Sequence, residues 1–432
     1  MNSKTLDSKN NISFGQKTDK MNHHSNSKNK FLSKRFFSSK NQQFYKTQIL
    51  QRLKNLQNSE LIISDSEGET RLGNKKTDNS ISATIHFEDM QCYQDIALGG
   101  SNAAAETYIQ GRWQTDNLSN VIRIMARNTD LIDEIDNGIT AMATWLLRQW
   151  HARNKNSLAG SRKNIAAHYD LGNDFFRLFL DEKMMYSSYI YKEGDDLHTA
   201  STRKLAAICT QLNINNEDHV LEIGSGWGGF ACFAAETTGC KVTTITISKE
   251  QYHEALSLVK ERNLQNLVSV ELRDYRDIKN TYDKVVSIEM IEAVGHHYLD
   301  TYFEAIANAL KPGGEALIQA ITLQDHRYEQ SLKEVDFIKR YIFPGSFIPC
   351  VSVISQSAGK KALVMENLLD IGLSYAKTLK DWRERFFDNI DTVRKQGFDE
   401  QFIRMWEFYL CYCEGGFKER AISDVQIHFR KA

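Results

Sequence analysis

The chain has 432 residues, 41% of them apolar, and a formal net charge of −1 at pH 7. This length and composition are typical of a globular protein with two or three compact units. No run approaches the roughly 20 consecutive apolar residues that span a bilayer, and the first residues lack the apolar stretch of a signal peptide. We therefore expect a cytoplasmic protein.

The charge is unevenly distributed along the chain. Residues 1–46 hold nine Lys and one Arg against two Asp, a charge near +8, which leaves about −9 for the remainder. This polar segment has no hydrophobic periodicity, so we predict a disordered basic tail. The tail either is simply solvated or tethers the protein to an anionic membrane, where each basic residue contributes about 1 kcal/mol. It lacks the interleaved aromatic residues of single-strand binders, and we expect no nucleic-acid partner.

A small α+β domain is predicted over residues 47–150. Short strand-like runs at 60–64 and 83–87 are followed by a helical pattern around 120–125. A longer helical stretch at 130–150 leads to a polar linker at 151–162, where we place a domain boundary.

The remainder of the chain, 163–432, has the pattern of an α/β domain. Five predicted strands alternate with helical stretches, and they cover residues 219–223, 241–245, 268–272, 284–288 and 315–319. Such alternation predicts a doubly wound, mostly parallel sheet. Ligands of these sheets lie beyond the carboxyl ends of the strands, so the chemistry is expected just after the predicted strands.

A glycine-rich loop follows the first of these strands. Gly224, Gly226 and Gly228 stand between the strand and a predicted helix, where glycines let the backbone approach a ligand. Such a loop can serve NAD, FAD or S-adenosylmethionine, or can be a tight structural turn. A dinucleotide site usually has an acidic residue at the end of the second strand. Residues 246–251 begin with Thr-Ile-Ser instead, whereas Glu222 before the first glycine favours a methyltransferase.

Other clusters give weaker signals. The seven cysteines are scattered without a C-x-x-C pair, and His296-His297 has no accompanying ligand pattern, so we expect reduced thiols and no metal site. The charged run at 333–340 predicts an amphipathic helix. Its polar face is either solvated or in contact with lipid head groups.

A series of motifs in residues 164–432 carries a specific resemblance. They occupy residues 167–176, 186–188, 222–229, 246–251, 274–277, 291–295, 300–303, 341–344 and 409–417. In this order and spacing they resemble the cyclopropane fatty acid synthases, including the mycolic acid cyclopropane synthases. A weaker similarity at 96–101 and 106–108 extends into the first domain, as in the longer bacterial enzymes. The resemblance implies a Rossmann-like class I methyltransferase sheet with helical lid elements, preceded by a small lipid-associated α+β domain.

The resemblance also implies S-adenosylmethionine as the cofactor. The positions that match the family's cofactor site are Tyr186, Ser187, Glu222, Gly224, Ser225, Gly226, Gly228, Thr246, Ile247, Ser248, Gln251, Tyr275 and Arg276. We expect loop amides to meet the methionine carboxylate, Thr246 and Gln251 to contact the ribose, and the Tyr275 ring to lie near the adenine. The alternative for Tyr275 is a ring that only caps the sheet edge.

A bound bicarbonate ion is the base that the resemblance implies. The five positions of that pocket read Ser188, Glu292, Gln319, Ile321 and Tyr375. Ser188 stands where many members have Cys, and Gln319 where many have His. An amide can hydrogen-bond an anion but cannot titrate, so the sequence allows bicarbonate binding but not a histidine-assisted proton step. Glu289 is a second carboxylate in the same loop that could share the chemistry.

The expected reaction is methylene transfer from S-adenosylmethionine to the cis double bond of an unsaturated phospholipid acyl chain, which forms a cyclopropane ring. Tyr169, Tyr302 and Phe343 are candidates to line the substrate path and stabilise the carbocation, or else belong to the core. Methyl-branched lipid products, a small-molecule amine acceptor and a non-catalytic binding module stay open. We expect peripheral contact with the inner face of the membrane, and we favour a homodimer.

Overall fold

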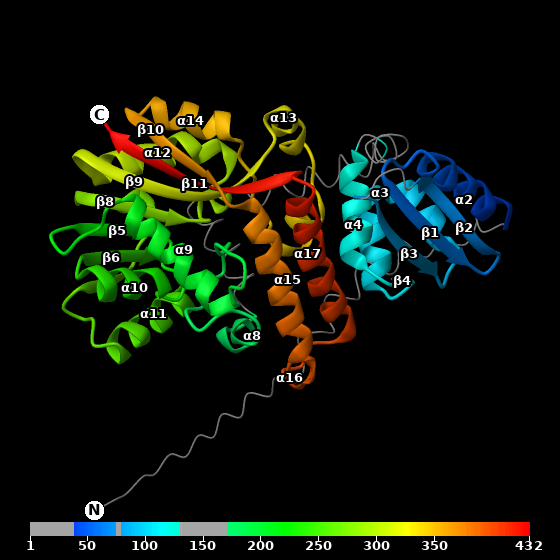
Figure 1. Cartoon of the computed structure of the whole chain (residues 1–432), viewed down its shortest axis with the longest axis horizontal. Coiled ribbons are helices and arrows are strands. Elements are labelled where there is room, and N and C mark those ends of the chain that lie inside the picture. The colour runs from blue at the N-terminus through cyan, green and yellow to red at the C-terminus, as the bar shows by residue number, and fades with distance from the viewer. Residues whose placement is uncertain (1–38, 75–78, 130, 132–170) are drawn as a thin grey trace, which may run out of the picture.

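The computed structural model describes residues 39–74, 79–129, 131 and 171–432. These residues form two units, a small sheet with its helices and a larger sheet flanked by helices (Figure 1). Apart from Leu131, the predicted helix at 130–150 and the linker at 151–162 lie outside the described residues, as does Tyr169.

The smaller unit is built around a four-stranded sheet of order β2-β1-β3-β4. Its elements are α2 (Ser39–Leu53), β1 (Ser59–Asp65), β2 (Gly68–Asn74), β3 (Ile81–Phe87), α3 (Gln91–Ile109), β4 (Trp113–Thr115) and α4 (Leu118–Arg127). β1 and β3 run parallel and contain the two predicted strands. Alternate residues of β1 are buried, among them Leu61 and Ile63, because successive side chains of a strand point to opposite faces.

Helix α2 corrects the predicted extent of the basic tail. The helix begins at Ser39, inside the segment expected to be disordered up to residue 46. Lys46 is buried, and its ammonium group lies 2.7 Å from Asp65 and 2.8 Å from Glu67. Ile49 and Leu53 on the same helix join the hydrophobic core. The charge of the segment did not predict this helix, because the ion pair that Lys46 forms with β1 is a tertiary contact.

The larger unit contains a seven-stranded sheet of order β10-β11-β9-β8-β5-β6-β7. The strands are β5 (His219–Ile223), β6 (Lys241–Thr246), β7 (Val268–Leu272), β8 (Tyr282–Ile288), β9 (Leu310–Leu323), β10 (Leu363–Asp370) and β11 (Ile422–Lys431). β5 to β9 pair in parallel, which confirms the doubly wound α/β prediction. β11 runs antiparallel between β9 and β10.

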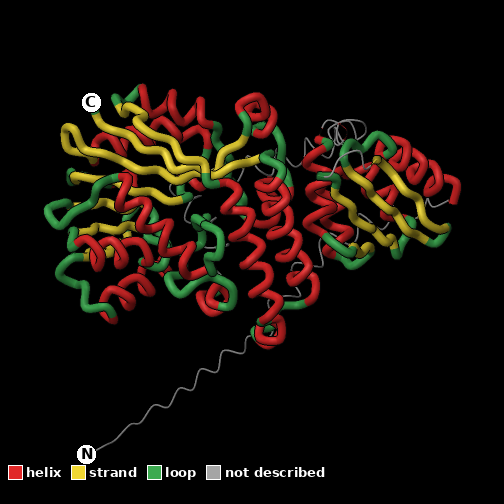
Figure 2. Tube along the Cα trace, in the orientation of Figure 1, coloured by secondary structure: helices red, strands yellow, loops and turns green. Residues whose placement is uncertain are grey.

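Helices cover both faces of this sheet (Figure 2). α9 (Leu197–Gln211), α10 (Gly229–Thr238) and α11 (Lys249–Glu261) pack together on one face, whereas α12 (Leu299–Ala309) and α14 (Val351–Gly359) pack on the other. The remaining helices are α8 (Asn173–Arg177), α13 (Tyr328–Ser331), α15 (Gly372–Asp388), α16 (Ile390–Lys395) and α17 (Glu400–Lys418). α15 and α17 pack against each other between the large sheet and the smaller unit (Figure 1).

The two units are joined through α17. The carboxylate of Glu419, just after this helix, accepts hydrogen bonds from Arg123 (2.6 Å) and Arg127 (2.5 Å) of α4. Arg404 donates to the carbonyl of Tyr108 at 2.6 Å. Gly415 brings α17 close to α4, because a Cβ there would lie 2.6 Å from Ile122. The packing of α3 and α4 on α17 therefore holds the smaller unit against the larger one.

The predicted amphipathic helix at 333–340 is wrong. Only a short π-helix, Ile338–Ile342, forms here. Lys339 is buried and donates to the carbonyls of Ser331 and Glu334, while Arg340 pairs with Glu106 of α3 at 2.7 Å. Lys339 therefore holds the loop together internally, and Arg340 fixes it against the smaller unit.

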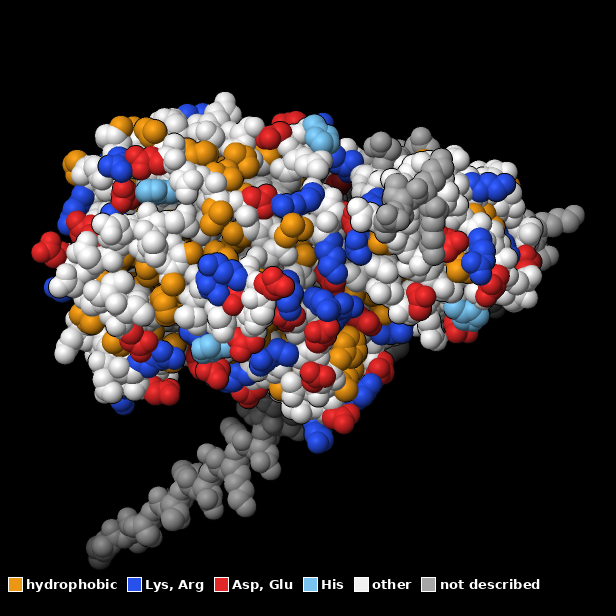
Figure 3. Space-filling view, in the orientation of Figure 1, with side chains coloured by type: hydrophobic (Ala, Val, Ile, Leu, Met, Phe, Trp, Pro, Cys, Tyr) orange, Lys and Arg blue, Asp and Glu red, His pale blue; other side chains and the backbone are white. Residues whose placement is uncertain are grey.

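Three further observations bear on the expected surroundings of the protein. No helix in the described residues has the length and apolar character needed to cross a membrane. Basic and acidic side chains are intermixed over the visible face in Figure 3. All seven cysteines are free thiols.

Candidate active site

A cavity of about 800 Å³ opens at the carboxyl ends of β5, β6 and β8. Its lining includes the glycine loop after β5, the residues after β8 and aromatic side chains of α15 and α17. It also reaches apolar residues of the smaller unit, including Leu61, Ile63, Ile85 and Phe87. The sheet thus places the cavity where the doubly wound pattern predicted it.

The glycine loop has the backbone conformation that its sequence requires. Gly224, Gly226 and Gly228 have φ values of 95°, 48° and 92°, in the left-handed region that favours glycine. The amides of Gly224 and Ser225 donate to the carbonyl of Ile245 at 3.0 and 2.9 Å, which fixes the loop on β6. α10 begins at the next residue, Gly229, so the loop leads directly into a helix N-terminus. This arrangement suits the negative end of a ligand.

Glu222 lies at the end of β5 below this loop. It is buried and accepts a hydrogen bond from the Thr244 hydroxyl at 2.5 Å. Burial raises the pKa of Glu222 to about 8. Glu222 therefore links β5 to β6 beside the cavity.

The segment after β6 is held by its own hydrogen bonds. The Thr246 hydroxyl lies 3.1 Å from the Gln251 side-chain oxygen, and both residues line the cavity together with Ile247. Ser248 is the N-cap of α11 and accepts from the Gln251 amide at 3.3 Å. Gly228 likewise precedes α10 and packs on α11. Among the predicted cofactor positions, Gly228 and Ser248 shape the lining from behind, and the others line the cavity.

Tyr275 and Arg276 lie in a short 3-10 helix, Tyr275–Asp277, after β7. The Arg276 guanidinium pairs with Asp274 at 2.7 Å and lies 5.3 Å from the Tyr275 ring centre. The Tyr275 ring lies edge-on to Tyr302, with ring centres 5.7 Å apart. The Tyr275 ring therefore forms part of the cavity wall, and Arg276 and Tyr302 hold it in place.

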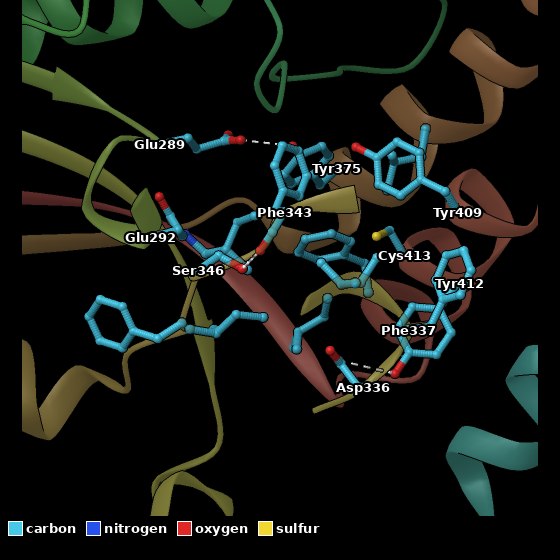
Figure 4. Close-up of a pocket in the computed structure, with 18 of the residues that line it drawn as sticks. Glu289, Glu292, Asp336, Phe337, Phe343, Ser346, Tyr375, Tyr409, Tyr412 and Cys413 are labelled. Carbon is cyan, nitrogen blue, oxygen red and sulfur yellow. Dashed lines mark hydrogen bonds between the residues drawn. The ribbon is translucent and has the colours of Figure 1, made fainter. Parts of the chain in front are cut away.

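The predicted substrate-lining residues differ in where the structure places them. Phe343 lines the cavity near Tyr375 and Tyr409 (Figure 4). Tyr302 is fully buried on α12 in the core behind Tyr275 and is not among the described lining residues, so its assignment to the substrate path is wrong. The sequence could not distinguish a wall residue from the core residue that supports it.

Glu289 is the centre of a hydrogen-bond network at the end of β8. Its Oε1 accepts from the Ser188 amide at 2.6 Å and from the Gln319 side-chain amide at 2.8 Å. Its Oε2 accepts from the Tyr375 hydroxyl at 2.7 Å (Figure 4). Burial raises the pKa of Glu289, while these hydrogen bonds and the nearby charge of Lys204 act in the opposite direction. Both Glu289 and Tyr375 line the cavity.

Glu292 lies one turn further along the same loop. Its Oε1 accepts from the Ile321 amide at 2.5 Å, whereas its buried Oε2 has no hydrogen-bond partner among the described residues. Burial, with the charge of Glu289, raises the pKa of Glu292 to about 8. Its surroundings thus favour the neutral form of Glu292.

Sequence reasoning missed two titratable residues of this cluster. Asp424 of β11 is fully buried, and its Oδ2 accepts from the Gln319 amide at 3.0 Å. Burial, with the charge of Glu289 beside it, raises its pKa well above the ordinary value. Lys204 of α9 is also fully buried, donates to the Ser187 hydroxyl at 2.8 Å, and has its pKa lowered to about 8 by burial.

The structure brings the five predicted bicarbonate positions together, but it does not leave their donors free. The Ser188 amide, the Gln319 amide and the Tyr375 hydroxyl all donate to Glu289, and the Ile321 amide donates to Glu292. An added anion would also lie beside the Glu289 carboxyl group. These residues therefore do not fit a bicarbonate ion.

The residues of the glycine loop and the segments after β6 and β7 do fit S-adenosylmethionine. Together with the sheet order, they define a class I S-adenosylmethionine-dependent methyltransferase. The chain belongs to the mycolic acid cyclopropane synthetase family, whose sequence pattern matches residues 156–427. This match confirms the family that the motifs predicted.

Characterised relatives carry two kinds of name. The chain is 36% identical to the tuberculostearic acid methyltransferase UfaA1 of Mycobacterium tuberculosis, over 80% of this chain and 82% of that protein. It is 34% identical to the cyclopropane-fatty-acyl-phospholipid synthase of Escherichia coli, over 82% and 89% of the two chains. Among solved structures, the cyclopropane synthase MmaA2 of M. tuberculosis matches with a TM-score of 0.59 and 26% identity, covering 62% of this chain and 98% of that one. The protein is thus a lipid methyltransferase or cyclopropane synthase.

Proposed function

We propose that this protein transfers a one-carbon unit from S-adenosylmethionine to the cis double bond of an unsaturated phospholipid acyl chain, forming a cyclopropane ring. The observation that most supports this reaction is that three features meet in one cavity. A cofactor loop, a largely apolar wall and a group of buried carboxyl groups meet there. An apolar alkene needs the wall, and loss of a proton after methyl transfer needs a base.

Positioning is the main task of the cavity, because an alkene is a weak nucleophile. When bound, S-adenosylmethionine supplies an electrophilic methyl group. Loop residues 222–228, the segment 246–251 and the Tyr275 ring would hold it. Apolar side chains such as Phe343 exclude water from the cavity. Aromatic faces stabilise a desolvated cation by about 2 kcal/mol or more.

The smaller unit would hold part of the acyl chain. Leu61, Ile63, Ile85 and Phe87 line the same cavity as the glycine loop, although they belong to the other sheet. This continuity supports the lipid-associated role expected for residues 47–150. We further propose that the enzyme docks at the inner face of the membrane to reach its phospholipid. The homodimer stays a prediction.

A methyl-branched product is the second candidate. It is supported by the similarity to a protein named tuberculostearic acid methyltransferase. Both reactions share the first methyl transfer, and loss of a proton from the resulting cation gives either the ring or a methylene branch in the same cavity. A saturated methyl branch would also need a reductant that supplies hydride.

The test uses the full-length protein, vesicles of dioleoyl phosphatidylglycerol and S-adenosylmethionine labelled in its methyl group. The fatty acids are released and analysed by mass spectrometry and proton NMR. We expect label in the oleoyl chains, with a gain of one methylene and the upfield signals of ring protons. Vesicles of the saturated dipalmitoyl lipid are the control and should take up no label. Binding of S-adenosylmethionine without label in any fatty acid would contradict the proposal, and exomethylene or methyl signals would favour the branched product.

A further inference from the structure

We propose that Glu289 is the base of this active site, in place of a bicarbonate ion, so that turnover needs no external anion. This inference rests on the proposed transfer of a one-carbon unit to an alkene. It starts from the disagreement between the predicted bicarbonate pocket and the contacts that the pocket residues make.

The first argument is geometric. Three donors converge on the Glu289 carboxylate, from Ser188 at 2.6 Å, Gln319 at 2.8 Å and Tyr375 at 2.7 Å. They come from three separate segments, the loop before α9, the strand β9 and the helix α15. A carboxylate and a bicarbonate ion present the same planar pair of acceptor oxygens. Glu289 therefore uses the donors that a bicarbonate ion would need.

The second argument is electrostatic. The cluster contains three acidic side chains. Glu289 accepts three hydrogen bonds, whereas Glu292 and Asp424 each accept one. Hydrogen bonds to a carboxylate favour its charged form, so the negative charge of the cluster belongs on Glu289. Burial raises the pKa of all three groups, to about 8 for Glu292 and well above the ordinary range for Asp424, but only at Glu289 do three hydrogen bonds oppose it. Lys204 and Tyr375 are the other titratable groups that act on Glu289, and both favour its charged form.

The third argument is the backbone at Glu289. Its φ is 47°, in the left-handed region that a residue with a Cβ seldom adopts. The Glu289 amide donates to the Gln319 carbonyl at 2.9 Å, which holds this conformation against β9. A non-glycine residue kept in such a conformation is a mark of functional sites. Here the conformation directs the carboxylate toward Tyr375 and the cavity (Figure 4).

The proposed step balances without another reactant. The alkene forms a bond to the methyl carbon, the sulfur–methyl bond breaks toward sulfur, and the second alkene carbon becomes a cation. The electron pair of one methyl C–H bond then closes the ring on this cation. The proton passes to a Glu289 oxygen, and Glu289 later releases it to water.

The first arm of the test measures anion binding without turnover. Carbon-13 NMR follows labelled bicarbonate added to the full-length protein and to the Glu289→Gly variant. We expect no bound signal with the original protein and a saturable one with the variant, because Ser188, Gln319 and Tyr375 then have free donors. Bicarbonate bound by the original protein at this site, or by neither protein, would overturn the inference.

The second arm measures lipid labelling in buffer freed of carbon dioxide, with and without added bicarbonate. We expect the original protein to be equally active in both. Glu289→Gln and Glu289→Gly should each lose roughly 10²- to 10⁴-fold in turnover, the usual contribution of a general base. Only Glu289→Gly should recover with bicarbonate, since the amide of the Gln variant still fills the pocket. Glu304→Gln, an exposed substitution on α12, is the matched control and should keep full activity.

The two arms separate the possible failures. Dependence of the original protein on bicarbonate, or full activity of Glu289→Gln, would overturn the role of Glu289 and leave the proposed function intact. If the original protein labels no lipid under any condition, the proposed function and the base assignment both fall. The binding arm would then still decide whether Glu289 occupies the anion pocket. Cofactor affinity and thermal unfolding of each variant exclude a folding defect as the cause.

Discussion

Replacing Gly229 by alanine should damage the cofactor site through a single methyl group. Gly229 is the first residue of α10, and a Cβ there would lie 2.4 Å from the Lys183 carbonyl oxygen and 2.7 Å from the Met185 sulfur. Ordinary contact begins at 3.4 Å, so the backbone at Lys183 must move by about 1 Å. Such overpacking costs about 1–3 kcal/mol, which exceeds the fraction of a kcal/mol that alanine gains at a helix end.

The displaced segment leads directly into the cofactor site. Tyr186 and Ser187 line the cavity immediately after it. We expect Gly229→Ala to lower the free energy of unfolding by about 1–3 kcal/mol and to weaken S-adenosylmethionine binding about tenfold, since 1.4 kcal/mol corresponds to a factor of ten. Urea denaturation and titration calorimetry measure the two effects.

Gly359→Ala is the matched control for this prediction. Gly359 ends α14, and a Cβ there would meet no atom within 4 Å. This variant should be as stable as the original protein or up to about 1 kcal/mol more stable, with unchanged cofactor affinity. If Gly229→Ala behaves like Gly359→Ala, the close approach of Lys183 to α10 does not constrain the cofactor site.

Three further predictions concern hydrogen bonds and ion pairs. Tyr375→Phe removes a donor from Glu289 that contributes roughly 1.5–3 kcal/mol to its charged form, so the acidic limb of the pH profile of kcat/KM should move up by about one to two pH units. If the acidic limb of the profile does not move, Tyr375 does not act on the group that serves as the base. The pKa of Glu222 rises from 4.5 to about 8 on folding, so the protein binds a proton that the unfolded chain has lost, and stability should fall as the pH rises through this range. Glu222→Gln should flatten this slope in urea denaturation at several pH values, and an unchanged slope would assign it to other groups. Glu419→Gln weakens the bonds to two arginines of α4 and should lower the free energy of unfolding by about 1–3 kcal/mol, whereas equal stability would show that apolar packing alone joins the units.

The parallel strands could be predicted because their signal is local. β5 and β7 have the bounds that their apolar, β-branched runs indicate, residues 219–223 and 268–272. β9 is longer than its predicted core at 315–319, since its pairing with β11 extends from Glu315 to Leu323. That extension depends on a partner about a hundred residues away in the chain. The helix α2 was missed for the same reason.

The residues of the candidate site also fall into two groups, those that a local pattern predicts and those that only tertiary contacts bring together. The cofactor loop lies within one strand–loop–helix segment, so its glycines and Glu222 were recognisable. Asp424 could not be recognised, because only the register of β11 brings it beside the cluster, opposite Ile321 on β9. Glu289 stood in the sequence as one of two nearby carboxylates. Its central place results from a left-handed backbone and three distant donors, which no local pattern contains.

Gln319 and Glu289 are best understood as a pair. A neutral imidazole, which many relatives were expected to have at position 319, donates one hydrogen bond, whereas an amide nitrogen donates two. The Gln319 nitrogen lies 2.8 Å from Glu289 and 3.0 Å from Asp424 and can therefore serve both carboxyl groups. Its oxygen accepts from Gln426 at 3.1 Å, which fixes the orientation of the amide. A base built into the chain needs a fixed donor that does not titrate with it, and a glutamine held by a second glutamine meets that need.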